Sequence, residues 1–176
     1  MALTNAYYGS ALYHLSLWAR PPAALAVSWP RAWPGDGARG AAMIAGEFRV
    51  AGEVLRHPAP PWDGSEPLRP EFAAELHRFA WLADVLAAPG NSGLYAAGEW
   101  TRGWIDHCDV WAPLAWRADI LADRLVAWTE HFNAVARDDE FRARLLRSFA
   151  RQARHLARVA GRAAPGLPRL GALRGA

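Results

Sequence analysis

The chain has 176 residues, of which 52% are hydrophobic, and a formal net charge of +3. These values describe one globular domain with a hydrophobic core, and they exclude a disordered chain. The single cysteine, Cys108, excludes an internal disulfide framework and a cysteine-rich zinc site, and we expect it to be free and buried.

All 20 basic residues are arginine, and they are unevenly distributed along the chain. Residues 1–136 contain 10 arginines and 14 acidic residues, whereas residues 137–176 contain 10 arginines and 3 acidic residues. The net charge is therefore −4 in the first part and +7 in the second. Because arginine wholly replaces lysine, as GC-rich codon usage favours, the high isoelectric point alone does not indicate a nucleic-acid partner.

The first predicted element is a helix near the N-terminus. Leu12, Leu15 and Trp18 form a helical stripe, and Pro21-Pro22 ends it. We expect this helix to pack on the domain or cap it; the alternative is an amphipathic helix that lies on a surface. The segment lacks the basic and apolar regions of a signal peptide, which predicts a cytoplasmic location. No apolar run approaches the roughly 20 residues that a transmembrane helix needs.

A segment rich in Trp, Pro and Gly follows and is predicted to be irregular. It contains one short predicted helix over 38–45. Two short strands are predicted on either side of Ala51-Gly52, as a small hairpin. A proline-rich connection then leads to the helical part. We therefore divide the chain into an N-terminal segment, 1–66, and a helical array, 67–176.

From Glu71 onward the apolar residues follow helical spacing. The pattern predicts four helices over 71–86, 94–107, 116–136 and from 138 or 139 to 161. Short connections between consecutive helices favour antiparallel pairs, so the predicted fold class is all-α, an array of α/α hairpins. No sequence motif repeats between the pairs, so no named solenoid repeat is indicated.

The third predicted helix carries the candidate binding site. At roughly 100° per residue, Arg117, Arg124 and His131 form a line that borders the apolar face beside Trp128. In one interpretation these side chains line a groove and bind a carboxylate or sulfate, which a guanidinium grips with two hydrogen bonds. In the other, the arginines are structural: they either lie along the apolar surface with the charged group in solvent or pair with acids on a neighbouring helix. Three acidic residues fall on the far face and are predicted to be solvated: Asp119, Asp123 and Glu130.

The fourth predicted helix carries a stripe of arginines roughly opposite its apolar face: Arg147, Arg151, Arg154 and Arg158. We expect this stripe to be a solvated outer surface. The alternative is a strip that binds a polyanion. No aromatic residues alternate with the arginines and no nucleic-acid-binding motif is present, so no nucleic-acid partner is predicted. The tryptophans around the second and third helices are predicted to be core residues.

Motifs that would indicate catalysis are absent from the sequence. It contains no phosphate-binding loop, no nucleophile elbow and no zinc-binding pair of histidines, so we expect no cofactor and no metal. His107 lies between Asp106 and Asp109 and could take part in acid–base chemistry. A cluster of polar groups at a helix end is the simpler interpretation of these three residues.

The stretch RAWPGDGARGAAMIAGEFRVAGE resembles the entry segment of bacterial heparinase II/III-like proteins. The matching residues are Trp33, Pro34, Gly35, Asp36, Arg39, Gly40, Gly46, Phe48, Gly52 and Glu53. The helical segments that follow are in the order of that family, so the resemblance covers the chain from Trp33 onward. It implies a partial α/α toroid here and a β-sandwich after it, in a polysaccharide lyase that cleaves uronate-containing glycans by β-elimination.

The resemblance also implies partners and limits. The partner would be an acidic, uronate-containing polysaccharide, bound by Arg117, Arg124, Trp128 and His131. The family's catalytic residues lie in later segments, so none is assigned here and the chain alone is expected to be inactive. A missing β-sandwich partner or self-association would cover the open end of the toroid, and a periplasmic location is the alternative that the resemblance implies. The alternative function is a non-enzymatic helical protein-interaction module.

Overall fold

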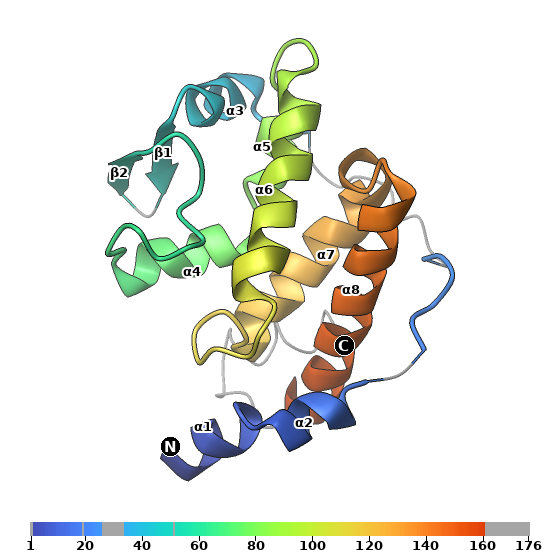
Figure 1. Ribbon diagram of the computed structural model, residues 1–176. Coiled ribbons are helices and arrows are strands. Elements are labelled where there is room, and N and C mark those ends of the chain that lie inside the picture. The colour runs from blue at the N-terminus through green and yellow to red at the C-terminus, as the bar shows by residue number, and fades with distance from the viewer. Residues whose placement is uncertain (1, 19, 26–33, 51, 161–176) are drawn as a thin grey trace.

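The computed structural model describes residues 2–18, 20–25, 34–50 and 52–160, with side chains from Asn5 onward. This part of the chain is mostly helical with one small β-hairpin, which confirms the predicted all-α class (Figure 1). The elements are α1 (Ala2–Tyr8), α2 (Ala11–Ser16), α3 (Gly37–Ile44), β1 (Glu47–Val50), β2 (Glu53–Arg56), α4 (Pro70–Arg78), α5 (Leu82–Leu86), α6 (Ser92–Cys108), α7 (Ala118–Val135) and α8 (Asp139–Val159).

The predicted hairpin is present and antiparallel. Phe48 pairs with Leu55 and Val50 with Glu53 across the two strands. Gly52 adopts a positive φ of 79°, a conformation that glycine reaches without strain. Phe48 and Val50 point into the same hydrophobic core as the helices, so the two predicted segments, 1–66 and 67–176, share one core.

The glycine-rich segment before the hairpin packs tightly on α5. Asp36 caps α3 by accepting hydrogen bonds from the backbone N–H groups of Ala38 and Arg39. Asp84 on α5 accepts a hydrogen bond from the Asp36 backbone N–H at 2.8 Å and pairs with Arg39 at 3.1 Å. A Cβ atom added at Gly40 would lie 2.0 Å from the Asp84 carbonyl oxygen, so α3 reaches this position only with glycine. Trp33 lies outside the described residues.

The single helix predicted over 71–86 is wrong, because α4 and α5 are separated at Phe79. This residue has a left-handed conformation, with φ 61°, and its side chain is fully buried. Its ring stacks on Trp62 at 5.8 Å and meets Trp128 edge-to-face at 5.3 Å. The Trp81 indole N–H donates to the Leu76 carbonyl at 3.0 Å, and the same carbonyl also accepts from the Phe79 backbone N–H at the end of α4. Aromatic packing therefore outweighs the local helical pattern here.

Helices α6, α7 and α8 follow the predicted ranges closely and run in alternating directions beside one another (Figure 1). Helix α4 packs across α7. Four of the five predicted core tryptophans, Trp100, Trp104, Trp116 and Trp128, are buried, and the fifth, Trp111, is half-buried against the core. Asp138 caps α8 by accepting from the Phe141 backbone N–H.

The N-terminal segment packs on the C-terminal end of α8, as Figure 1 shows. The Tyr13 hydroxyl lies 2.8 Å from His155 Nδ1, and both side chains are buried. Arg154 donates to the Leu17 carbonyl at 2.9 Å, and Arg158 donates to the Ser16 carbonyl at 2.8 Å. These arginines satisfy carbonyls that the end of α2 leaves without helical partners. The N-terminal segment therefore packs on the domain as expected, but it forms two short helices, α1 and α2, and the stripe that predicted the helix is exposed.

Candidate functional site

Arg124, the central residue of the predicted binding site, is fully buried. Its guanidinium donates three hydrogen bonds at 2.8–2.9 Å, to the Gln152 side-chain oxygen and to the backbone carbonyls of His77 and Ala115. The cation also lies over the Trp104 ring, 4.2 Å from its centroid. Burial lowers the pKa of Arg124 to about 9, so the group remains charged at neutral pH. This arginine joins α4, α7 and α8 inside the protein.

The other three predicted residues are not gathered around an open groove. Trp128 is fully buried, and among the described residues its indole N–H has no hydrogen-bond acceptor. His131 is 3% exposed and borders a shallow depression with Arg78 and Glu130. Arg117 alone has a half-exposed side chain, at 50%. Arg124 is therefore a structural residue, as the second interpretation states. Its hydrogen-bond acceptors are two backbone carbonyls and a side-chain amide, however, and not the acidic residues that this interpretation names. Glycan binding by these four residues stays a prediction.

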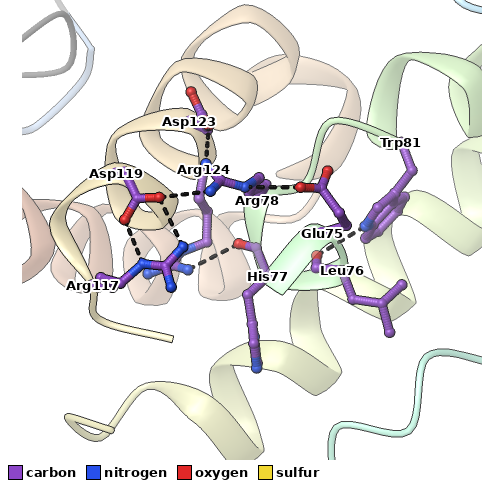
Figure 2. A network of polar contacts seen from close by, with 9 residues as sticks. All are labelled: Glu75, Leu76, His77, Arg78, Trp81, Arg117, Asp119, Asp123 and Arg124. Atoms are coloured by element: carbon purple, nitrogen blue, oxygen red, sulfur yellow. Dashed lines mark hydrogen bonds and ion pairs between the residues drawn. The ribbon is translucent and has the colours of Figure 1, made fainter. Parts of the chain in front are cut away.

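A network of charged groups joins α4 to the start of α7, as Figure 2 shows. Arg78 donates to Asp119 at 2.6 Å and pairs with Asp123 and Glu75. Arg117 also pairs with Asp119 at 2.6 Å. Asp119 is 6% exposed, so the prediction of a solvated residue is wrong. Although burial opposes its ionisation, the two arginines hold the pKa of Asp119 near 2.

The arginine stripe of α8 is only in part the solvated surface that its spacing predicts, because Arg147 and Arg158 are exposed while Arg151 and Arg154 are half-buried. Arg154 and Arg158 bind the end of α2, and Arg151 pairs with Asp109 before α7. Only Arg147 of the four has no partner in the part of the chain that the structure describes, and its side chain is exposed. The stripe therefore anchors the N-terminal segment and the α6–α7 connection to α8.

A hollow of about 510 Å³ lies where the N-terminal segment meets α6 and α8. Sequence reasoning did not find it, because its residues come from three separate segments. The residues that line it are Trp18, Arg20, Pro21, Ile105, Asp109, Arg144, Arg147 and Arg151. Four of them are arginines and one is acidic. The only sequence signal was the excess of positive charge after residue 136.

The outer side of α2, together with Trp18 just after the helix, adjoins this hollow and is apolar. Leu12, Leu15 and Trp18 are 79%, 66% and 77% exposed. Tyr13 and Leu17, on the opposite side of the same turns, are buried in the core. We call the three exposed residues the α2 apolar face. The apolar stripe that predicted the helix therefore faces solvent. The contact with the core is made by Tyr13 and Leu17.

The cluster around His107 is a set of ion pairs between helices. Asp106 pairs with Arg144, and Asp109 accepts from the Ser148 hydroxyl at 2.5 Å as well as from Arg151. The simpler interpretation, a polar helix end, accounts for these contacts. In residues 2–18, 20–25, 34–50 and 52–160 no group of three metal-ligating side chains is present, and no helix is long and apolar enough to cross a membrane.

Two buried histidines should make the protein less stable in acid. Burial, with a smaller effect of nearby cations, lowers the pKa values of His77 and His155 to about 4, from about 6.5 in an unfolded chain. Between these values the unfolded state binds more protons, so the free energy of unfolding falls as the pH falls through this window. Urea unfolding should show a loss of about 2–3 kcal/mol between roughly pH 7 and pH 5. His155→Gln should reduce this loss by about half. Equal free energies of unfolding at pH 7 and pH 5 would contradict the prediction.

The described fold is a single all-α domain with a β-hairpin, held by buried aromatic and arginine contacts, with one basic hollow beside an apolar face. No family model and no solved structure matches the chain. The chain is similar to FtsZ-localized protein C of Caulobacter vibrioides, with 30% identity over 158 residues. The match covers 87% of this chain and 27% of that protein, so the chain spans about a quarter of its relative's length.

Proposed function

We propose that the chain is a helical protein-interaction module that takes part in localisation at FtsZ. The proposal rests on the α2 apolar face, which presents Leu12, Leu15 and Trp18 to solvent. The relative's name supports the choice of FtsZ, because that protein is described as FtsZ-localized. A non-enzymatic role also agrees with Arg124, whose hydrogen bonds are directed to protein groups inside the core.

The apolar face is held in place by specific contacts on the other side of α2. Tyr13 binds His155, and Arg158 binds Ser16, so the helix is fixed to α8 while its outer residues stay exposed. Exposed apolar residues that lie together mark an interaction site more often than scattered ones do. A partner that covers this face would remove three large side chains from water, each worth about 1.5–3 kcal/mol when fully buried.

The test is the position of a fluorescent fusion of the chain in Caulobacter vibrioides cells that also carry labelled FtsZ. We expect the fusion to colocalise with FtsZ. A variant with Leu12→Ser, Leu15→Ser and Trp18→Ser should become diffuse, because it loses the apolar contact without disturbing Tyr13 or Leu17. The same images test the cytoplasmic location that the N-terminal sequence predicts.

The matched control alters exposed apolar residues on other surfaces. Val54, Tyr95 and Val110 are 48%, 66% and 66% exposed, and changing all three to serine removes three exposed apolar side chains while leaving the α2 apolar face intact. This variant should colocalise as the wild type does. A diffuse wild-type fusion, or loss of colocalisation in both triple variants, would refute the role of the α2 apolar face.

The second candidate function is the one that the sequence resemblance implies. In it, the chain is the N-terminal part of an α/α toroid that binds uronate-containing polysaccharide, and the complete protein cleaves it. One observation favours it. The residues Gly35, Asp36, Arg39 and Gly40 of the resembling segment form one packed unit on α5. Binding of a heparan sulfate oligosaccharide, one arm of the experiment below, tests it.

A further inference from the structure

The basic hollow beside α2 has charge that the described residues leave uncompensated. Arg144 and Arg151 pair with Asp106 and Asp109. Arg20 and Arg147 also line the hollow, and neither has an ion-pair partner among the residues that the structure describes. Two guanidinium groups thus face one concave site without carboxylates of their own. A ligand that supplies carboxylates would complete both pairs, since guanidinium and carboxylate groups match in geometry.

The hollow is continuous with the α2 apolar face through Trp18. This side chain lines the hollow and also forms the last member of the Leu12, Leu15 and Trp18 series. Ile105 adds an apolar patch to the floor of the hollow. A ligand that covers both surfaces must therefore carry acidic groups and apolar groups along its length.

Resting on the proposed interaction function, we propose that this surface binds an acidic, amphipathic segment of a partner protein. Apolar side chains of the segment lie on Leu12, Leu15 and Trp18, and its carboxylates bind Arg20 and Arg147. This mode corresponds to an amphipathic helix that lies with its apolar residues along a groove.

The shape and composition of the surface favour a peptide over two other anionic ligands. A small anion would pair with the arginines but would leave the apolar face uncovered. A lipid surface would cover exposed apolar side chains but is too flat to fill a concave site of about 510 Å³. A peptide places side chains in the hollow and backbone along α2 at the same time.

The experiment measures fluorescence anisotropy of a labelled amphipathic peptide that alternates leucine pairs with glutamates. A matched peptide carries glutamine in place of each glutamate. We expect the glutamate peptide to bind and the glutamine peptide to bind much more weakly. Arg147→Gln should weaken binding of the glutamate peptide by about tenfold, because one charge-assisted pair of hydrogen bonds is lost. Trp18→Ser should weaken binding of both peptides, because both use the apolar contact with Trp18.

The control variant is Arg56→Gln, which removes the same charge from an 81% exposed side chain on the hairpin. This variant should bind the glutamate peptide with the same affinity as the wild type, at low and at moderate salt concentration. Equal weakening by Arg147→Gln and Arg56→Gln would mean nonspecific charge attraction and would overturn the proposal. The proposal also fails if the peptide does not bind while vesicles of anionic phospholipid, or a heparan sulfate oligosaccharide, do so in an Arg147-dependent way.

This experiment and the colocalisation test fail independently. If the fusion colocalises with FtsZ but the peptide does not bind, the interaction module stands and its acidic ligand is wrong. If the peptide binds through Arg147 but the fusion stays diffuse, the site is real and FtsZ is not where it acts.

Discussion

Alanine at position 40 should lower the free energy of unfolding by about 3 kcal/mol or more, the upper range for overpacking a close contact. The new Cβ atom would lie 2.0 Å from the Asp84 carbonyl oxygen and 2.5 Å from its carbon. Both atoms belong to the backbone of α5, so no side-chain rotation relieves the clash. Helix α3 must move away from α5, and this motion also lengthens the contacts of Asp84 with Asp36 and Arg39.

The control is a second helical glycine with space around it. A Cβ atom at Gly98 on α6 would lie 3.6 Å from the Val135 carbonyl oxygen, an ordinary contact distance. Gly98→Ala should therefore leave stability unchanged or raise it by up to about 1 kcal/mol, the difference in helix propensity. Urea unfolding followed by circular dichroism compares the two variants with the wild type. Equal midpoints for Gly40→Ala and Gly98→Ala would show that α3 does not pack on α5 as described.

Local sequence patterns predicted the elements whose conformation is determined by neighbouring residues in the sequence. The hairpin follows from alternating side chains around a glycine, and α8 follows from apolar spacing and a capping aspartate. The break at Phe79 could not be predicted in this way, because most of the rings that pack on Phe79, those of Trp62, Trp104 and Trp128, are distant in the sequence and only Trp81 is near. A left-handed phenylalanine has no local signal.

The candidate sites show the same division between local and distant information. Helical angles correctly placed Arg124 beside an apolar face, but they do not give the depth of burial. Its acceptor on Gln152 lies 28 residues further along the chain, and no pattern within one helix indicates that pair. The arginines of α8 face away from that helix's own apolar side, as predicted, yet two of them, Arg154 and Arg158, bind the N-terminal segment there. The hollow exists only because this segment folds back onto α8.

Replacing the Arg124 guanidinium with an apolar side chain is the second change with a large expected effect. Arg124→Met should lower the free energy of unfolding by about 3 kcal/mol, because the carbonyls of His77 and Ala115 and the Gln152 amide lose a buried donor. Arg124→Lys should be at least as destabilising. It keeps a buried charge, but one ammonium group cannot reach three acceptors arranged around a planar guanidinium.

Arg117 provides the matched control, since it lies on the same helix line and its side chain is 50% exposed. Arg117→Met should cost no more than about 1 kcal/mol, because the Arg117 side chain is half-exposed and the buried Asp119 keeps its ion pair with Arg78. Urea unfolding of the three variants separates the two interpretations of the line from Arg117 to His131. A large loss at Arg124 alone identifies that guanidinium as the group that holds α4, α7 and α8 together. If Arg124→Met instead unfolds at the same urea concentration as the wild type, the hydrogen bonds contribute little to stability, and the hypothesis that Arg124 serves an anionic ligand is favoured.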